Sequence, residues 1–443
     1  MSGIAARVSR TTEPAETAPT PARPAPRALD VTVVGIGEDG WPGLSERARE
    51  IVLGAETVLG APRQLAFLPA ETRPRQRAWP SPMGPFLDRL AEALIPPDAA
   101  DFEGARRLVL LASGSPMLHG IGASLAARGG AGRFAVIPHL STLTLACARL
   151  GWPEAEVALV SACGHPVEAL AAELTPDGRA LVLSADGRTP AAVAALLRDG
   201  GYGASTLHVL ERLGGPAEAG HSFRADETED VPVFDRLNAV AVAMRPDPET
   251  VPLPRTGLPD DAFDHDGQIT KRDVRLSALA RLRPMPGALL WDIGAGAGSI
   301  GIEWCRAAPR ATAIGVERDA LRAERARKNA ATLGAVGYRV FDLAMPEGLE
   351  ALLTAEPTRP DAIFLGGGAT VPDLLDKLLA ILAPGGRLVA HGVTLETEAV
   401  LLEAFQRHGG ELSRLQSAHA DPVGRFTALR PAMAVTQWCY CAG

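Results

Sequence analysis

The sequence predicts an α/β protein of two domains, and three observations carry this prediction. The chain of 443 residues is longer than one ordinary domain. After the first 28 residues, buried-type strands alternate with helical segments along the whole chain. Five prolines fall between Arg245 and Asp261, a density that excludes a regular helix or a central strand. We therefore expect one domain at residues 29–245, a proline-rich linker at 246–260 and a second domain at 261–443.

Composition narrows the class of protein. Hydrophobic residues make up 47% of the chain and charged residues 22%, as in ordinary globular proteins. The formal net charge of −8 disfavours a polyanionic partner, so we expect no nucleic acid as substrate. No apolar run reaches the roughly 18 residues of a membrane helix, so we expect no membrane association. Residues 1–28 lack the apolar segment of a secretory signal and predict a disordered tail on a cytoplasmic protein.

The cysteines predict neither a disulfide framework nor a metal site. There are five of them, and their positions lack paired metal-ligand spacing. The Cys439-x-Cys441 pair near the C-terminus is better explained by a terminal strand than by metal binding. We expect reduced thiols and no bound metal.

The N-terminal half begins with a strand of β-branched residues, LDVTVVGIG, which ends in Gly35 and Gly37. A helix is expected over 45–60, with Ser45 as its N-cap. The other expected strands are 107–112, 134–137, 180–184, 205–210 and 239–244. The other expected helices are 86–95, 118–128, 141–150, 165–173 and 189–199.

The C-terminal half predicts a Rossmann-like domain with a seven-stranded sheet. The expected parallel strands are 288–293, 311–316, 337–341, 361–365 and 386–391. The expected helices are 270–283, 299–307, 319–333, 346–354, 371–382 and 395–407. Candidate strands at 411–417 and 432–440 would complete the sheet in antiparallel orientation.

Residues 288–317 carry the most informative motif of the chain. An apolar strand runs into Gly294, Gly296 and Gly298, and after a helix a second strand ends at Glu317. Glycines let the backbone turn sharply beside a ligand, and an acid at this place accepts both hydroxyls of a ribose. The spacing is G-x-G-x-G, and S-adenosylmethionine (SAM) lacks the pyrophosphate for which dinucleotide sites keep G-x-G-x-x-G. We interpret the motif as the SAM site of a methyltransferase. An ordinary tight strand-to-helix turn would explain the glycines but not the acid.

Three loops of this half are expected to meet, because ligands of parallel sheets bind outside the carboxyl ends of the strands. They are 292–299, 317–318 and 366–368. The last reads FLGGGAT and lacks the Asn/Asp-Pro-Pro-aromatic motif of enzymes that methylate amines of nucleic acids. Methyl transfer is an in-line displacement, which needs alignment of donor and acceptor but no protein nucleophile.

The segments FDHDGQITKRDVRLSALARLRPMPGALLWDIGAGAGSIGIEW, FLGGG and LAPGGRLVAHGVTLET carry a family resemblance over about 180 residues. They resemble the methyltransferase and decarboxylase half of the precorrin-6Y C(5,15)-methyltransferase family of cobalamin biosynthesis. The resemblance implies methylation of a meso carbon and loss of carbon dioxide from the ring-C acetate. Where relatives commonly have an aspartate that contacts adenine, this chain has Ala344, so backbone groups or Asp342 would hold adenine. The implied SAM-site residues are Thr270, Gly294, Ala295, Gly296, Gly298, Ser299, Glu317 and Ala344.

The N-terminal half contains VVGIGEDG, RLVLLASGSPMLHGIG, PHLSTLTLACARLGWP and ADGRTPAAVAALLRDGGYG in that order. These segments resemble the tetrapyrrole methylases, whose fold holds SAM in a cleft between two α/β lobes. The resemblance implies methylation of the other meso carbon of the same precorrin. The implied cofactor-binding positions are Gly35, Gly37, Gly114, Ser115, Ser141 and Thr142.

Catalytic and substrate-binding candidates come from loops that match the family. The candidates for the acid that decarboxylation needs are His265, Asp266, His391 and Glu396. The candidates for binding substrate carboxylates are Lys271, Arg272, Arg275 and Arg188. A solvated basic helix face is the alternative for the first three, and a helix-capping role is the alternative for Arg188.

Together the two halves predict a bifunctional enzyme. It would use SAM to methylate precorrin-6Y at meso carbons 5 and 15 and decarboxylate the ring-C acetate, giving precorrin-8X. We also expect a homo-oligomer. Two alternatives remain open from the sequence: a sensor that binds SAM or a corrinoid without turnover, and a methyltransferase that acts on another small molecule.

Overall fold

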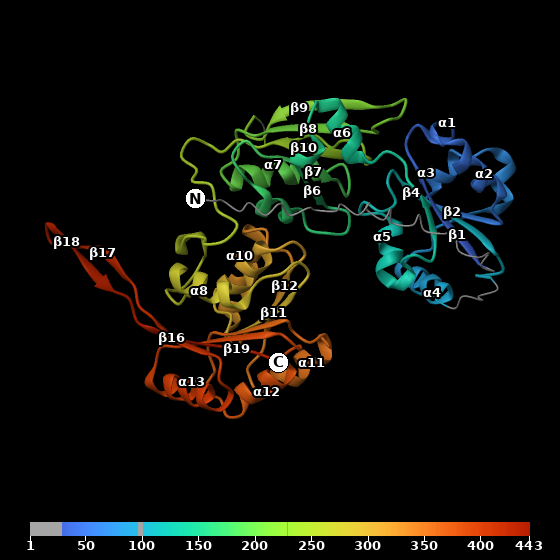
Figure 1. The fold of residues 1–443 in the computed structure, drawn as a ribbon. Coiled ribbons are helices and arrows are strands. Elements are labelled where there is room, and N and C mark those ends of the chain that lie inside the picture. The colour runs from blue at the N-terminus through green and yellow to red at the C-terminus, as the bar shows by residue number, and fades with distance from the viewer. Residues whose placement is uncertain (1–28, 96–100, 228) are drawn as a thin grey trace, which may run out of the picture. The chain divides into compact units, whose positions relative to one another are not determined.

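The computed structural model describes residues 29–95, 101–227 and 229–443 (Figure 1). The predicted disordered tail, residues 1–28, lies outside these ranges. The chain divides into two compact units between Ser141 and Thr142. This division falls well before the proline-rich segment, and the domain limits drawn at that segment stay a prediction.

The first unit contains a parallel five-stranded sheet in the order β3-β2-β4-β1-β5. Its strands are β1 (Asp30–Ile36), β2 (Thr57–Gly60), β3 (Gln76–Ala78), β4 (Arg107–Ser113) and β5 (Ala135–Ile137). Its helices are α1 (Gly40–Gly43), α2 (Glu46–Gly54), α3 (Pro62–Ala66), α4 (Gly84–Leu94) and α5 (Ile121–Leu125), with a 3-10 helix over Ala70–Arg75. Because β1 lies between β4 and β5, the loops that follow these three strands leave the sheet side by side.

The predicted helix over 45–60 is correct only in its first part. It begins as expected, since Ser45 Oγ accepts a hydrogen bond from the Ala48 N–H at 3.2 Å. The helix ends at Gly54, and Thr57–Gly60 form the buried strand β2. Here β-branched residues pack between two neighbouring strands, an environment that favours a strand over a longer helix.

Two further predicted helices take other forms. The segment 118–128 is α-helical only over Ile121–Leu125, and Gly129 then adopts a left-handed backbone with φ of 94°. The segment 165–173 folds as a 3-10 helix over Val167–Glu173.

The second unit begins with a mixed five-stranded sheet in the order β6-β7-β10-β8-β9. Its strands are β6 (Val157–Ser161), β7 (Arg179–Leu183), β8 (Thr206–Glu211), β9 (Ala219–Arg224) and β10 (Asn238–Ala243). Its helices are α6 (Thr142–Leu150) and α7 (Thr189–Asp199), with a further 3-10 turn over Glu154–Glu156. The sequence missed β6 and β9; β9 is an edge strand whose residues are mostly exposed and give no apolar alternation.

The last residues of the proline-rich segment are fixed to the C-terminal sheet domain. Leu258 is fully buried, and the N–H groups of Gly257 and Leu258 donate to the carboxylate of Glu303 at 2.6 and 3.1 Å. A 3-10 turn over Asp260–Ala262 follows. This end of the predicted linker is therefore packed structure.

The C-terminal domain contains the predicted seven-stranded sheet, in the order β13-β12-β11-β14-β15-β19-β16. The strands are β11 (Leu289–Ile293), β12 (Thr312–Glu317), β13 (Tyr338–Asp342), β14 (Ala362–Leu365), β15 (Arg387–Gly392), β16 (Glu411–Leu415) and β19 (Val435–Cys441). The first five are parallel, and β16 and β19 complete the sheet in antiparallel orientation, as expected.

Helices cover both faces of this sheet and bury two separate cores (Figure 1). The helices are α8 (Arg272–Leu282), α9 (Ser299–Ala307), α10 (Ala320–Thr332), α11 (Gly348–Ala355), α12 (Leu374–Ile381) and α13 (Leu395–His408). Helices α8 to α10 pack on one face, where Trp304 and Phe364 are buried. Helices α11 to α13 pack on the other, where Trp291 and Trp438 are buried. Among the described helices, none is both long enough and apolar enough to span a membrane.

A hairpin that the sequence did not predict is inserted between the last two strands of this sheet. Strands β17 (Ala418–Val423) and β18 (Phe426–Pro431) pair only with each other and lie between β16 and β19 in the chain. Figure 1 shows the hairpin extending away from the sheet. Its side chains are largely exposed.

Candidate active site

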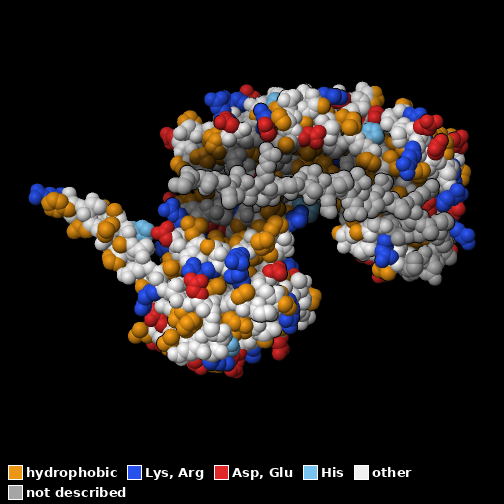
Figure 2. Space-filling view, in the orientation of Figure 1, with side chains coloured by type: hydrophobic (Ala, Val, Ile, Leu, Met, Phe, Trp, Pro, Cys, Tyr) orange, Lys and Arg blue, Asp and Glu red, His pale blue; other side chains and the backbone are white. Residues whose placement is uncertain are grey.

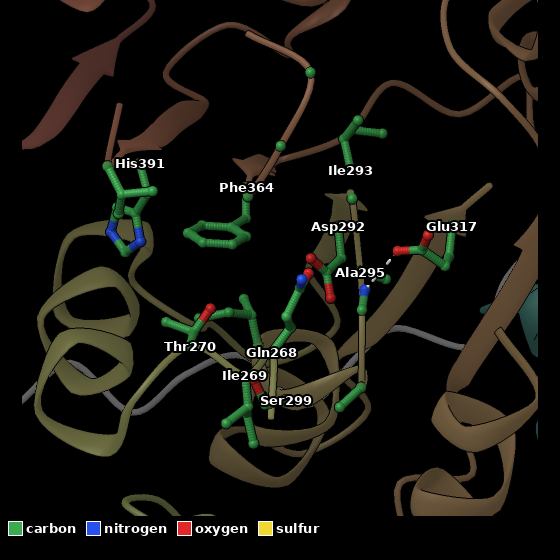
Figure 3. A pocket seen from close by; sticks show the side chains of 18 of the residues that line it. Gln268, Ile269, Thr270, Asp292, Ile293, Ala295, Ser299, Glu317, Phe364 and His391 are labelled. Atoms are coloured by element: carbon green, nitrogen blue, oxygen red, sulfur yellow. Dashed lines mark hydrogen bonds between the residues drawn. The ribbon is translucent and has the colours of Figure 1, made fainter. Parts of the chain in front are cut away.

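A cavity of about 1040 Å³ opens at the carboxyl ends of β11, β12, β14 and β15 (Figure 3). The three loops that the sequence predicted to meet there all line it. The lining includes Gln268 to Lys271, Asp292 to Ala297, Glu317, Arg318, Gly366 to Gly368 and His391. Residues at the base of the hairpin, Ser417 and Met433, also line it.

The glycine-rich loop needs its glycines for two different reasons. Gly294, Gly296 and Gly298 all have a left-handed backbone, with φ of 75°, 56° and 80°. A Cβ on Gly294 would lie 2.9 Å from the backbone nitrogen of Gly367, so two of the converging loops touch here. A Cβ on Gly296 would meet nothing closer than 3.9 Å, so the backbone of this residue faces open space in the cavity.

Gly298 does not line the cavity. It is the N-cap of α9, and a Cβ there would lie 2.8 Å from the ring of Tyr338. Ala295 and Ser299, which belong to the same predicted set, do line the cavity. Gly298 therefore shapes the start of the helix, and its predicted contact with the cofactor stays a prediction.

Glu317 lies where the sequence placed it. It ends β12, is 7% exposed and lines the cavity. Its carboxylate accepts hydrogen bonds from the N–H groups of Gly296 at 2.8 Å and Asp319 at 3.0 Å. Glu317 is therefore hydrogen-bonded to the glycine-rich loop that lines the same cavity.

Asp292 is a buried cavity residue that the sequence analysis did not select. Its Oδ2 accepts from the Tyr338 hydroxyl at 2.9 Å and the Gly301 N–H at 3.0 Å. Its Oδ1 is buried and has no hydrogen-bond partner among the described residues. Burial raises the pKa of Asp292 to about 6, against the lowering effect of the two hydrogen bonds. The sequence did contain a signal for Asp292, because a carboxylate stands at the end of a buried strand directly before the glycines.

The Thr270-Lys271 turn lines the cavity as predicted, but Arg275 does not. Arg275 is fully buried, and its Nε donates to the carboxylate of Glu303 at 2.6 Å. Its Nη1 donates to the carbonyl of Thr270 at 2.6 Å, and Nη2 donates to the carbonyl of Leu258. The prediction that Arg275 binds a substrate carboxylate is wrong, because its charge is already paired inside the protein. It holds the turn that carries the neighbouring Lys271.

His391 lines the cavity from β15 and is 8% exposed. Its ring packs against the edge of Phe364 with centroids 4.9 Å apart (Figure 3). Burial lowers the pKa of His391 to about 4, and the positive charge of Arg281 acts in the same direction. The ring is therefore neutral at pH 7, which argues against the predicted role as a proton donor.

The remaining candidates of this half lie outside the cavity lining. His265 Nδ1 accepts from the Gly267 N–H at 3.0 Å within its own loop. Glu396 is exposed in the first turn of α13. Ala344 is exposed, and its neighbours Leu343 and Met345 line the cavity instead. Asp266 pairs with Arg322 at 2.8 Å, and this contact lowers its pKa, so it is a poor proton donor.

In the first unit, the predicted residues gather at the carboxyl ends of β1, β4 and β5. A Cβ on Gly35 would lie 2.1 Å from the carbonyl oxygen of Gly114 and 2.7 Å from the backbone nitrogen of His139. Gly114 has φ of 57°, and its N–H donates to the Ile36 carbonyl at 3.1 Å. A Cβ on Gly37 would lie 2.7 Å from Asp39 Oδ1. Backbone groups thus hold these loops against one another.

Ser115 and Ser141 follow the same strand ends, and Thr142 and Arg188 belong to the second unit. Ser115 comes directly after Gly114, Ser141 is 8% exposed, and Thr142 begins α6. Arg188 precedes α7 as its N-cap residue and is exposed. No contact described for these residues tests their predicted roles in binding.

Comparison with known proteins decides the family. Residues 30–227 match the model of the tetrapyrrole (corrin/porphyrin) methylases, and residues 261–442 match that of the precorrin methyltransferase domain. A precorrin-6Y C(5,15)-methyltransferase [decarboxylating] of Mycobacterium tuberculosis is 43% identical over 416 residues, which cover 92% of this chain and 98% of that protein. The chain belongs to the precorrin-6Y C(5,15)-methyltransferase (decarboxylating) family.

A shorter protein and a solved domain each match part of the chain. A probable cobalt-precorrin-6B C(15)-methyltransferase (decarboxylating) of Pyrobaculum aerophilum is 32% identical over 186 residues, which cover 41% of this chain and 93% of that protein. A solved structure, the C-terminal domain of precorrin-6Y C5,15-methyltransferase from Rhodobacter capsulatus, is 41% identical. It covers 43% of this chain and 100% of that chain, with a TM-score of 0.39.

The comparisons and the structure together confirm two predictions from the sequence. The chain combines a tetrapyrrole methylase domain with a second methyltransferase domain, and that second domain has a seven-stranded sheet. The chain is accordingly a methyltransferase of the decarboxylating class.

Proposed function

We propose that this chain transfers methyl groups from SAM to meso carbons 5 and 15 of precorrin-6Y and removes carbon dioxide from the ring-C acetate, giving precorrin-8X. One observation carries the proposal most directly. In the C-terminal cavity, the open backbone at Gly296 and the acid Glu317 line one space together with Asp292, whose buried Oδ1 has no hydrogen-bond partner among the described residues.

These residues fit SAM by charge and by shape. The space over Gly296 admits a ligand to the backbone, and Glu317 ends the strand where a ribose-binding acid is expected. The buried Asp292 oxygen without a partner suits a cationic ligand, because an unpaired buried polar atom costs free energy. SAM supplies a positively charged sulfonium whose methyl group is electrophilic.

The residues of the chain align the donor and keep water out. Glu317 and the glycine loop would hold one end of the ligand, and the turn at Thr270 lines the same cavity. Phe364 and Met345 supply apolar walls. A site of low polarity favours attack on the sulfonium methyl, because that step neutralises the positive charge.

Basic side chains at the cavity suit an acidic acceptor. Lys271 and Arg318 line it, and so does Arg322, which is paired with Asp266. Lys271 is half exposed and lies 3.5 Å from Asp260, so it stays accessible to a ligand. Guanidinium and ammonium groups bind carboxylates by charge-assisted hydrogen bonds, and the proposed substrate carries acidic side chains.

We assign methylation at carbon 15 and decarboxylation to the C-terminal domain. The Pyrobaculum relative, whose name gives C(15)-methylation and decarboxylation, aligns over 186 residues, a length close to the 261–442 match. We then assign methylation at carbon 5 to the tetrapyrrole methylase domain. Two sites in one chain would raise the local concentration of a released intermediate.

We further propose that the protein is a cytoplasmic homo-oligomer. Support for association comes from the hairpin β17–β18, where Val423, Phe426 and Leu429 are 53%, 67% and 71% exposed. Figure 2 shows hydrophobic side chains along this hairpin. Exposed apolar side chains gathered on one projecting element favour contact with another protein surface.

The test is a full-chain reaction with SAM and precorrin-6Y, followed by mass analysis. We expect a product with two added methyl groups that has lost one carbon dioxide. Glu317→Ala in the full chain should give one added methyl group and no loss of carbon dioxide. Saturable binding of both ligands without any change in mass would contradict the proposal and indicate a sensor.

A further inference from the structure

A line of hydrogen bonds crosses from the surface of α8 to the cavity and ends on His391. Arg281 Nη1 donates to Ser277 Oγ at 2.9 Å, and Ser277 Oγ donates to Gln437 Oε1 at 3.1 Å. Gln437 Nε2 lies 2.8 Å from His391 Nε2. His391 and Gln437 are directly opposite each other in the antiparallel pair of β15 and β19. We propose that this line fixes His391 as a neutral ring with its proton on Nδ1, and that this N–H donates a hydrogen bond to a carboxylate of the tetrapyrrole.

The direction of each bond follows from the donors and acceptors that meet, beginning with Arg281 and with Oε1 of Gln437 facing Ser277. A guanidinium can only donate, so Ser277 Oγ accepts from Arg281 and gives its single proton to Gln437 Oε1. The amide of Gln437 is thereby turned with its NH₂ group toward His391, whose Nε2 must accept. A neutral imidazole carries one proton, so that proton lies on Nδ1.

The surroundings of His391 keep the ring neutral and turn it to the cavity. Gln437 is fully buried, and the edge of Phe364 covers the ring with an interplanar angle of 89°. The charged group nearest along the line, Arg281, is positive and pairs with Glu411 at 2.6 Å. No described residue makes a hydrogen bond to Nδ1, and His391 lines the cavity. The lowered pKa of His391 agrees with a neutral ring.

The position of His391 points to the acceptor and not to SAM. Figure 3 shows His391 beyond Phe364, on the side away from Glu317. A neutral Nδ1–H can donate a hydrogen bond, but losing that proton would leave an imidazolate. His391 therefore orients the substrate without protonating it, and Gln437, Ser277 and Arg281 are positioning residues. This inference rests on the proposed function for its ligand, precorrin-6Y.

Two substitutions test the line in the full-length protein. Gln437→Glu places a group that only accepts against His391 Nε2, so the proton should move to Nε2. Ser277→Ala removes the group that orients the amide and should give a mixture of the two tautomers. Ser413→Ala is the matched control, because Ser413 also lies opposite Gln437 on the neighbouring strand, and its buried Oγ has no partner among the described residues.

The first readout is ¹⁵N NMR of the histidine rings, with the His391 signals assigned by their loss in His391→Asn. At pH 7 we expect the Nδ1–H tautomer in the unchanged protein and in Ser413→Ala, and Nε2–H in Gln437→Glu. An Nε2–H or doubly protonated His391 in the unchanged protein would overturn the proposal. This readout needs no substrate, so it stands even if the proposed reaction fails.

The second readout is the rate of carbon dioxide loss as precorrin-6Y is varied. Gln437→Glu should raise KM about 10-fold or more, as expected for a lost hydrogen bond to a charged group, with SAM affinity unchanged. His391→Asn keeps a donor near the Nδ1 position and should retain a lower KM than His391→Gln. Equal KM values for Gln437→Glu and Ser413→Ala would refute the role in substrate binding. A complete absence of product from the unchanged protein would instead refute the proposed function.

Discussion

The glycine-rich loops of the two halves have similar sequences but are held in different ways. In the first unit, backbone meets backbone: Gly35 lies so close to Gly114 and His139 that even a Cβ has no room. In the C-terminal domain, Gly294 also lies close to the backbone of Gly367, but side chains hold the other loops. Arg275 fixes the Thr270 turn, and Asn329 Nδ2 donates to the carbonyls of Asp264 and Ala297 at 3.0 Å each.

This difference shows that a Gly-x-Gly pattern alone does not tell whether a glycine is needed for close packing or for access of a ligand. Gly35 has an ordinary backbone conformation and is needed for space, whereas Gly296 has φ of 56° and open space around it. Only the second kind of glycine leaves room for a ligand at its own position. Substitutions of single residues should therefore act differently in the two halves.

The largest effect is expected from Arg275→Leu. It leaves the carboxylate of Glu303 buried without its partner, which costs about 3–5 kcal/mol of folding free energy. Hydrogen exchange should increase in residues 261–443 and not in residues 30–141. Arg272→Leu is the control, because Arg272 is exposed and lies 4.0 Å from Asp273, so it should change stability by less than about 0.5 kcal/mol. Equal effects of the two changes would show that side chains do not hold this half.

The next largest effect is expected from Gly35→Ala. The added Cβ must displace the carbonyl of Gly114, and overpacking of this kind costs about 1–3 kcal/mol. Chemical denaturation and hydrogen exchange should show the loss in the first unit. At Gly54 an added Cβ meets nothing within 4 Å, so Gly54→Ala should be neutral or stabilising. A Gly35→Ala protein as stable as Gly54→Ala would contradict the backbone-packing account.

A smaller effect on stability, with an effect on binding, is expected from Gly296→Ala. A left-handed backbone strains any residue with a Cβ by about 1–2 kcal/mol. Gly385→Ala has the same strain, with φ of 72° and nothing within 4 Å, but does not line the cavity. Both changes should lower stability alike, and only Gly296→Ala should weaken SAM binding in calorimetry. Unchanged SAM binding in Gly296→Ala would place the ligand elsewhere.

The smallest effect is a dependence of SAM binding on pH. The pKa of Asp292 is raised to about 6 in the folded protein, above its ordinary value of 3.8. The folded state therefore holds this proton more tightly, so the contribution of Asp292 to stability falls as pH rises from 3.8 to about 6. Above about 6 the carboxylate is charged and should attract the cationic donor, giving several-fold tighter binding. Asp292→Asn should remove both trends; a pH profile unchanged by that substitution would exclude Asp292 from the site.

The sequence predicted the features that depend on local pattern. Alternating strands and helices predicted the α/β class. The first strand of the C-terminal sheet, the glycines after it and Glu317 predicted the place of the C-terminal cavity. These signals lie within about thirty consecutive residues, where spacing alone fixes which groups meet. The cofactor-binding role of Gly298 stays a prediction; the residue lies outside the cavity lining and packs against Tyr338.

The features that the sequence missed depend on contacts between distant segments. Arg275 and Glu303 are 28 positions apart, and only the fold shows that they pair in a buried place. Gln437 and His391 are 46 positions apart and meet through an antiparallel strand pair. The hairpin β17–β18 carries no clear apolar alternation, because most of its side chains are exposed on both faces.

The central claim is that one chain holds two unlike SAM sites, one in each half. Titration calorimetry of the full-length protein with SAM tests it most directly. The account predicts two molecules of SAM per chain, and one molecule per chain after Glu317→Ala. A stoichiometry of one or none in the unchanged protein would contradict it.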